Sequence, residues 1–254
     1  MKIKVLGCSG GIGPGRRTTS LMINDHLLLD AGTGVGDLSF AALGRITDVL
    51  LTHSHLDHVC GLALALDTLF ERTRHPIRLH ATTATIALLR EHLFNWKLWP
   101  DFSALSCHGV PRLVYAPISP GEVRTFDGFT VTPFEVVHTV PAVGFALQAP
   151  GGTFAFSGDT YADESIWMAL NALPSLESLM IEISFVDEKA ELGRLSRHLT
   201  PQLLGRELGK LRHRPELLLT HHKPGQESAI ERECATALHG WHYRHLRRGD
   251  LLEF

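Results

Sequence analysis

Short apolar stretches, separated by glycine, proline and polar residues, recur along the chain and predict its strands. In the first half they lie at Lys2–Leu6, Ser20–Ile23, Leu27–Asp30, Ile46–Leu51 and Ile77–His80. In the second half they lie at Phe129–His138, Gly144–Gln148, Thr153–Phe156, Leu179–Ile183, Glu216–Thr220 and Leu251–Phe254. Runs of roughly four to eight such residues, bounded by turn residues, are typical of buried strands.

Longer stretches follow these strands and predict helices. They lie at Leu62–Phe70, Thr82–Leu93, Glu164–Leu170, Thr200–Leu211 and Glu227–Leu238. Thr200 is the expected N-cap of the fourth of these helices, and Pro201 suits the first helical position that follows it. Strands come first and helices follow in both halves of the chain, so we expect two sheets packed face to face with helices outside. No linker is visible, and residues 1–254 are therefore predicted to form a single domain.

One segment, at about residues 94–120, fits neither pattern. It is rich in aromatic residues and proline and is expected to be an irregular aromatic loop. Loops of this length inside compact domains are usually functional or mobile.

Composition excludes several classes of protein. The 254 residues are 44% hydrophobic and 20% charged, which is ordinary for a soluble globular domain. A net charge of -3 argues against a long nucleic acid as partner. No apolar run approaches the roughly 20 residues that span a bilayer, and the N-terminal apolar stretch is too short for a signal peptide. The scattered cysteines form no CxxC pair, so we expect reduced thiols in a cytoplasmic protein. They are Cys8, Cys60, Cys107 and Cys234.

Histidine is unusually frequent, with 16 residues, and it clusters directly after the predicted strand Ile46–Leu51. The segment HSHLDH holds four side chains that can bind metals, namely His53, His55, Asp57 and His58. Imidazole and carboxylate are the usual ligands of zinc and similar divalent ions. In a short turn, the first two histidines can face one way while the last two side chains face another. That geometry predicts two adjacent ions.

Further ligands are expected where later strands end. His138 ends the predicted strand Phe129–His138, Asp159 follows Thr153–Phe156, and His221 follows Glu216–Thr220. Each alone could be an ordinary polar residue at a strand end, but together with the HxHxDH segment they indicate a metal site. His222 competes with His221 for the last position.

With these residues in place, the chain resembles the metallo-β-lactamase superfamily over essentially its whole length. The resemblance implies an αββα four-layer sandwich with a dinuclear metal site. It implies that His53, His55 and His138 hold one ion, that Asp57, His58 and His221 hold the other, and that Asp159 bridges them. Zinc is the preferred metal on ligand type, with manganese or iron as alternatives. True β-lactamases of this fold carry cysteine where Asp159 stands, which argues against that activity.

Three segments resemble the class II cyclic-nucleotide phosphodiesterases. They are HSHLDHVCGL at His53–Leu62, LFNWKLWPDF at Leu93–Phe102, and the stretch Ile181–Leu208, which contains HLTP and precedes THHKP. LGCSGG and LLDAGTG near the N-terminus also fit. Where that family often carries serine after the histidine cluster, this chain has Cys60.

This resemblance implies the hydrolysis of 3′,5′-cyclic nucleotides to 5′-nucleotides. Asp57, Asp159 and His198 are the predicted catalytic residues, with His198 as the general acid. Asn95, Trp96 and Trp99 are predicted to bind the substrate together with His198, because aromatic faces stack on bases. Phe94 and Phe102 offer further faces. The expected partner is a small cyclic nucleotide rather than a membrane or a long nucleic acid, and a homodimer is left open.

Two alternatives remain. Ribonuclease Z, a tRNA 3′-end endonuclease, shares HxHxDH, the GDT at Gly158–Thr160 and a histidine like His198, but it normally carries a basic, glycine-rich arm that is not recognisable here. A metal-free or regulatory binding module on this scaffold is disfavoured by the intact set of seven predicted ligands.

The glycine-rich segment Gly7–Gly15 lacks the GK[ST] of a nucleotide P-loop. We expect it to shape the backbone beside the metal site. The basic pairs Arg16-Arg17 and Arg247-Arg248 are expected to be solvated surface.

Overall fold

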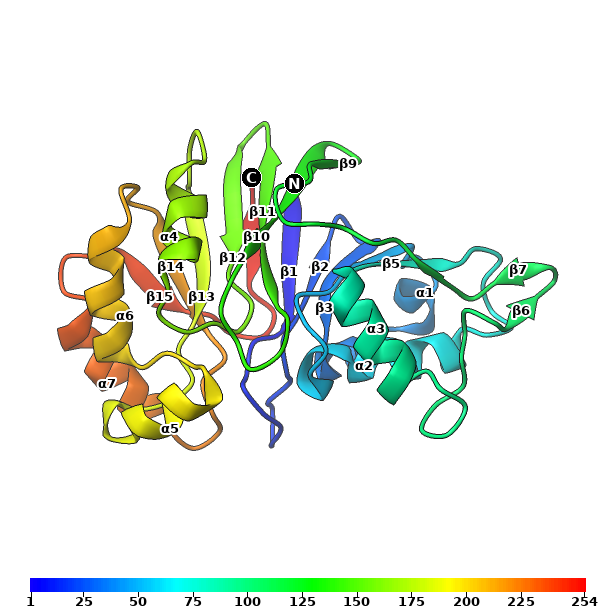
Figure 1. The fold of residues 1–254 in the computed structure, drawn as a ribbon, viewed down its shortest axis with the longest axis horizontal. Coiled ribbons are helices and arrows are strands. Elements are labelled where there is room, and N and C mark those ends of the chain that lie inside the picture. The colour runs from blue at the N-terminus through cyan, green and yellow to red at the C-terminus, as the bar shows by residue number, and fades with distance from the viewer.

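The computed structural model describes all residues 1–254, which form two seven-stranded sheets packed face to face (Figure 1). The first sheet has the strand order β16-β1-β2-β3-β4-β5-β8. Its strands are β1 (Lys2–Gly7), β2 (Ser20–Ile23), β3 (Leu27–Ala31), β4 (Asp48–Leu50), β5 (Ile77–His80), β8 (Leu113–Tyr115) and β16 (Leu251–Glu253). The strands β3, β4, β5 and β8 pair in parallel, so their carboxyl ends meet at one edge of the sheet.

The second sheet has the order β15-β14-β13-β12-β11-β10-β9. Its strands are β9 (Arg124–Phe126), β10 (Phe129–Glu135), β11 (Val143–Ala149), β12 (Gly152–Phe156), β13 (Ser178–Glu182), β14 (Glu216–Thr220) and β15 (Tyr243–His245). The strands β12 to β15 are parallel, and their carboxyl ends also share one edge.

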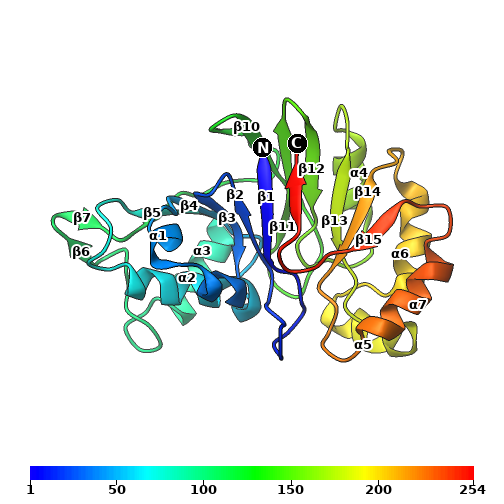
Figure 2. The same cartoon turned by 180° about the vertical axis from the view of Figure 1, so that it is seen from behind.

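Helices cover the outer face of each sheet, as Figures 1 and 2 show from opposite sides. On the first sheet they are α1 (Phe40–Leu43), α2 (Leu56–Thr68) and α3 (Thr83–His92). On the second they are α4 (Glu164–Asn171), α5 (Ala190–Ser196), α6 (Pro201–Glu207) and α7 (Glu227–Ala237). Short 3₁₀ turns lie at Thr33–Asp37, Asp187–Lys189 and Leu208–Lys210, and a small hairpin joins β6 (Ser106–Cys107) to β7 (Val110–Pro111). No helix is both long and apolar enough to cross a membrane.

Three apolar clusters account for this four-layer arrangement. The central one joins the two sheets, with Ile3 and Leu21 from the first sheet against Phe145 and Met180 from the second. The other two lie between each sheet and its own helices. Because both faces of each sheet are buried, most strands are apolar throughout rather than alternating. The αββα four-layer sandwich predicted from the sequence is confirmed.

The structure differs from the sequence prediction mainly at the boundaries of elements. Helix α2 begins at Leu56 rather than Leu62, because the HxHxDH segment itself enters the helix. His55 occupies the N-cap position and Asp57 lies in the first turn, where a carboxylate favours the helix dipole. The segment at 94–120 is not wholly irregular, because β8 pairs with β5 inside it, with Leu113 opposite Ile77. The short elements α5, β9 and β15 were not predicted.

Candidate metal centre

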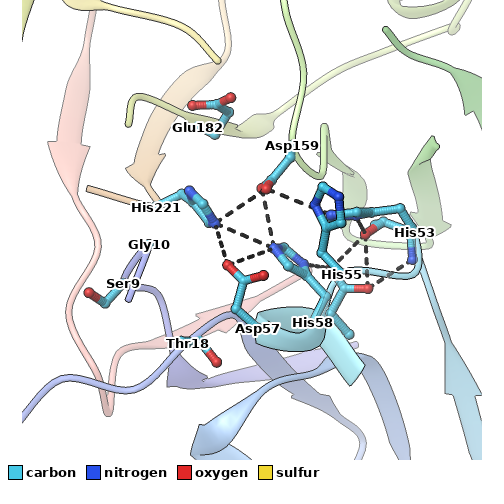
Figure 3. A network of polar contacts seen from close by, with 12 residues as sticks. Ser9, Gly10, Thr18, His53, His55, Asp57, His58, Asp159, Glu182 and His221 are labelled. Atoms are coloured by element: carbon cyan, nitrogen blue, oxygen red, sulfur yellow. Dashed lines mark hydrogen bonds and ion pairs between the residues drawn. The ribbon is translucent and has the colours of Figure 1, made fainter. Parts of the chain in front are cut away.

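The seven predicted ligands converge where strands of both sheets end. His53 lies just beyond β4, Asp159 just beyond β12, and His221 directly after β14. Asp57 and His58 come from the first turn of α2. Figure 3 shows the Asp159 carboxylate between His221 on one side and His53 and His55 on the other. Segments that are distant in sequence thus bring their polar side chains to one place.

One group of potential ligands consists of His53, His55, His138 and Asp159. Their ligand atoms all lie within 4.8 Å of one another. The Nε2 atom of His138 is 3.1 Å from Nδ1 of His55, and the Oδ2 atom of Asp159 is 3.8 Å from Nε2 of His53. Four ligands of a tetrahedral zinc ion lie about 3.4 Å apart, so this spacing suits one small divalent ion.

A second group consists of Asp57, His58, Asp159 and His221. The Nε2 atom of His221 lies 3.3 Å from Oδ2 of Asp57 and 3.3 Å from Oδ2 of Asp159. The Nε2 atom of His58 lies 3.3 Å from Oδ1 of Asp159. Asp159 is therefore the residue common to both groups, and a second ion fits beside the first.

One buried atom tests whether these residues fit metal ions. The Nε2 atom of His53 is buried and has no hydrogen-bond partner. Leaving a buried polar atom unpaired is costly, and such atoms in native proteins usually have a partner or a bound ion. This atom faces Asp159 within the first group. The donor set of imidazoles and carboxylates also matches zinc-type ions, so the residues fit the implied metals.

The electrostatics of the first group favour the protonation states that bind metals. Burial lowers the pKa of His53 well below its usual value, and it lowers that of His138 to about 4. Burial by itself would raise the pKa of Asp159, but attraction to His221 and His58 outweighs it and holds that pKa well below normal. Neutral imidazole and ionised carboxylate are the forms that bind metals.

Outer partners fix the rings of the ligands. The His58 Nδ1–H donates to Oδ2 of Asp30 over 2.6 Å, which leaves Nε2 free for a metal. The Thr52 hydroxyl donates to the same carboxylate over 2.8 Å and lies 2.9 Å from Nδ1 of His53. The His138 Nδ1–H donates to the carbonyl oxygen of Arg197 over 3.1 Å. Carboxylates and carbonyls in this position set the tautomer of metal-binding histidines.

A further chain of hydrogen bonds links His221 to His198. The Nδ1–H of His221 donates to Oγ of Ser184 over 2.9 Å, and Ser184 donates to Oε2 of Glu182 over 2.9 Å. The Nδ1–H of His198 donates to Oε1 of Glu182 over 2.7 Å. Burial by itself would lower the pKa of His198, but the Glu182 carboxylate outweighs it and raises that pKa above normal. His198 is thus held beside the metal groups in a form that can carry a proton.

His222 lies away from both groups. Its Nδ1–H donates to the carbonyl oxygen of Ile183 over 2.7 Å, and its Nε2 contacts Nδ1 of His245 at 2.8 Å. Both ring nitrogens are therefore engaged elsewhere. His221 has a positive φ of 64°, which is uncommon for a residue other than glycine. This turn sends the two adjacent rings to different surroundings.

The glycine-rich segment Gly7–Gly15 passes beside the last ligand. A Cβ atom on Gly10 would clash with the carbonyl oxygen of His221, and the Gly10 N–H donates to the carbonyl oxygen of His222 over 3.0 Å. The backbone must come this close, and only glycine permits it. The segment therefore shapes the backbone at the site, as its sequence suggested.

The aromatic loop uses several of its predicted substrate-binding groups internally. The Oδ1 atom of Asn95 accepts the N–H groups of Lys97 and Leu98, and the indole N–H of Trp99 donates to the carbonyl oxygen of Ala63. Phe94 and Phe102 are fully buried in the core and cannot stack on a base, which corrects that expectation. Trp96 is 61% exposed, so its ring is free to meet a ligand.

Sequence reasoning missed three residues that support the ligands, namely Asp30, Glu182 and Ser184. Asp30 ends the apolar run of β3 and Glu182 is the last residue of β13. A carboxylate that ends a buried strand was the available signal, the same signal that marked Asp159.

The comparisons with known proteins agree with this geometry. A family model described as a β-lactamase superfamily domain matches residues 26–222. A probable 3′,5′-cyclic-nucleotide phosphodiesterase of Yersinia pestis is 26% identical over 252 residues, covering 83% of this chain and 72% of that protein. A ribonuclease Z of Methanosarcina acetivorans is 24% identical over 282 residues, covering 87% of each chain. The crystal structure of unliganded yeast PDE1 superposes with a TM-score of 0.82 at 20% identity, covering 100% of this chain and 99% of that one.

Proposed function

The chain belongs to the β-lactamase superfamily, and we propose that it is a dinuclear-metal phosphodiesterase that hydrolyses 3′,5′-cyclic nucleotides to 5′-nucleotides. The observation that carries this proposal is the pair of ligand groups sharing Asp159, with the Glu182–His198 pair directly beside them. Such an arrangement can hold a phosphodiester and supply a proton to the oxygen that leaves.

Two divalent ions held by these residues would bind the phosphate and supply a water nucleophile of lowered pKa. The protein supplies the remaining functions. Asp159 keeps the two ligand groups at a fixed spacing, and Asp57 completes the second group. His198 donates a proton from Nε2 to the 3′ oxygen of the ribose, while Glu182 holds its Nδ1–H. A ribose alkoxide is a poor leaving group, so this proton transfer lowers the barrier to its departure.

The charge of the exposed segments supports a small substrate rather than tRNA. One excursion from the two large sheets runs from Phe94 to Arg112, between α3 and β8, and Lys97 and Arg112 are its only lysine or arginine residues. Arg112 is buried and donates to the carbonyl oxygens of Thr73 and Cys107. This excursion therefore offers only Lys97 to a phosphate backbone, whose binding depends on many lysine and arginine contacts.

The second candidate is a ribonuclease Z-like tRNA 3′-end endonuclease. The similarity to the Methanosarcina acetivorans ribonuclease Z over 87% of the chain favours it. The same ligand groups could serve that reaction, because it also cleaves a phosphodiester. The two functions differ in the size and charge of the substrate.

The proposal includes zinc as the metal and the cytoplasm as the compartment. Five histidines and Asp57 around the shared carboxylate of Asp159 support zinc, with manganese and iron as the alternatives. The four cysteines are unpaired, which supports a reducing compartment.

A substrate panel tests the proposal. Metal-loaded enzyme is assayed on cAMP, cGMP, bis(p-nitrophenyl) phosphate and unprocessed tRNA, with product identified by chromatography. We expect 5′-nucleotide from a cyclic nucleotide, with weak dependence on salt, and no tRNA cleavage. Efficient tRNA cleavage that falls steeply with salt, without turnover of either cyclic nucleotide, would assign the chain to the second candidate.

A further inference from the structure

A polar cavity of about 420 Å³ lies beside the glycine-rich segment and shares no residue with the two ligand groups. Four separate stretches line it: the glycine-rich segment with Arg16 and Arg17, the residue His222, the first turns of α7, and the segment that follows β15. A volume of this size falls in the range of small-molecule sites, roughly 300–1,000 Å³.

The two basic pairs are largely exposed, as the sequence suggested, and they meet at this cavity. Arg17 and Arg248 both contact Oδ2 of Asp37, at 2.8 and 2.9 Å. Arg16 contacts Glu227 at 2.9 Å. Arg247 lines the cavity and forms no ion pair with any side chain.

The charges at the cavity do not balance. Its lining holds four arginines and two glutamates, Glu227 and Glu231. Asp37 lies outside the lining and is shared by two of the arginines. Within this set four guanidinium groups face three carboxylates, and the guanidinium of Arg247 is the one without an ion pair. The nearby Asp250 accepts the backbone N–H of Arg247 over 2.9 Å, but its ion pair is with Arg244. Guanidinium groups form paired hydrogen bonds with phosphate oxygens, so the uncompensated charge favours a phosphate.

The polar atoms of the inner wall are engaged within the protein. The Sγ of Cys8 donates to the carbonyl oxygen of Leu246 over 3.3 Å. His222 uses its Nδ1–H on Ile183, and its Nε2 accepts from the Nδ1–H of His245. The wall is polar but largely satisfied, so the charged groups left for a ligand are Arg247, which suits its anion, and Glu231, which suits a hydroxyl or amino group.

Helix α7 adds to the preference for an anion. Glu227 and Ser228 of its first turn line the cavity, and the helix has 11 residues. The free N–H groups and the dipole at a helix N-terminus favour negative charge.

We propose that this arginine cavity is a second binding site, which takes a small phosphomonoester such as a nucleoside or sugar monophosphate. Arg247 and Arg248 hold the phosphate, and Glu231 accepts from the polar remainder of the ligand. The site is joined to the metal centre through the backbone, because the His221 N–H donates to the carbonyl oxygen of Cys8 over 2.8 Å. The proposal concerns binding and does not depend on which phosphodiester the enzyme hydrolyses.

Tungstate, a phosphate analogue with strong anomalous scattering, tests the site directly. Crystals of the metal-loaded enzyme are soaked in millimolar tungstate. We expect one ion at the metal centre and a second within hydrogen-bond distance of Arg247 in the wild-type enzyme. The second ion should be lost in Arg247→Gln and in the double variant R247Q/R248Q, while the first remains. Because the Arg247 side chain forms no ion pair, its single replacement should leave folding intact.

A double variant of two exposed arginines without ion pairs, R74Q/R232Q, is the matched control and should keep both ions. Tungstate at the metal centre alone in wild-type crystals would overturn the proposal, as would a second ion that persists in R247Q/R248Q. A fluorescent single-stranded oligoribonucleotide, measured by anisotropy, tests the other source of phosphate. Binding that weakens in R247Q/R248Q, with no tungstate in the cavity, would mark a polynucleotide surface and also overturn the proposal.

Discussion

The carboxylate of Asp30 and the imidazole of His58 form a pair with no exposed surface, with Nδ1 of the histidine 2.6 Å from Oδ2 of the aspartate. The hydrogen bond through Nδ1 fixes the ring with Nε2 toward the metal groups, 3.3 Å from Oδ1 of Asp159. A residue on a strand of the first sheet thus orients a ligand on the first turn of α2.

Replacing Asp30 with asparagine should weaken metal binding without removing a ligand. The neutral amide is a poorer acceptor for the Nδ1–H of His58, so the ring loses basicity and orientation. Changes to such outer partners usually cost about 10- to 100-fold in metal affinity. Competition with a chelator of known affinity measures the change. Asp25→Asn, on the exposed turn between β2 and β3, should retain wild-type affinity for the metal. Equal metal affinity in the Asp30 and Asp25 variants would remove Asp30 from this role.

The metal content itself tests the two ligand groups. Protein purified without chelator should carry about two equivalents of metal by elemental analysis, since Asp159 completes both groups. Asp159→Ala should lower the content clearly below that of the wild-type protein. Asp67→Ala, an exposed residue without polar partners on the same helix as Asp57, should not. One equivalent in metal-supplemented wild-type protein, unchanged in Asp159→Ala, contradicts the dinuclear assignment.

The sequence predicted which candidate ligands the fold brings together better than it predicted their supporting residues. HxHxDH carries four candidate ligands in six positions, and the remaining three follow strands whose apolar runs are easily recognised. Asp30 and Glu182 also end strands, but their importance arises only when the two sheets bring them against His58 and His198. Such long-range pairing leaves no periodicity in the sequence, and the meeting of Arg16-Arg17 with Arg247-Arg248 was missed for the same reason.

Replacing His198 with alanine should separate proton donation from metal binding. Metal content should stay at the wild-type level, because His198 belongs to neither of the two ligand groups that share Asp159. The kcat on a cyclic nucleotide should fall by at least about 100-fold, the usual size of general acid catalysis. The loss should shrink on bis(p-nitrophenyl) phosphate, whose leaving group needs no proton. His92→Ala, an exposed histidine, is the control; equal losses on both substrates would indicate that His198 positions the phosphate instead.

Asp48 should contribute to stability in a pH-dependent way, far from the metal centre. It contacts Nε of Arg78 and Nε2 of His80, both at 2.7 Å. Burial would raise its pKa, but these hydrogen bonds outweigh burial and hold the pKa well below the ordinary value of 3.8. A carboxyl whose pKa is depressed by folding stabilises the protein above its unfolded pKa and loses that contribution as the pH falls.

The free energy of unfolding of the wild-type protein should therefore exceed that of Asp48→Asn at pH 5 to 7. The difference should narrow progressively as the pH falls below about 4. Urea denaturation across this range measures it, with Asp67→Asn as a control that shows no such trend. A difference between wild type and Asp48→Asn that is constant from pH 7 to pH 3 would contradict the assignment.

The aromatic loop gives the last test, because its two tryptophans differ in environment. Trp96 is 61% exposed, whereas Trp99 is half-buried, packs against the core of the first sheet and donates its indole N–H to Ala63. If a base stacks on Trp96, Trp96→Ala should raise the KM for a cyclic nucleotide by at least about fivefold, since stacking contributes about 1–3 kcal/mol per base. It should leave the KM for bis(p-nitrophenyl) phosphate and the thermal stability unchanged. Leu98→Ala is the matched control, because Leu98 is also 61% exposed in the same loop but offers no aromatic face. Trp99→Ala should instead lower the Tm, because it removes packing and a hydrogen bond from the helix α2. Equal KM values for cyclic nucleotide in Trp96→Ala and Leu98→Ala would remove this loop from substrate binding and leave the base to be held elsewhere.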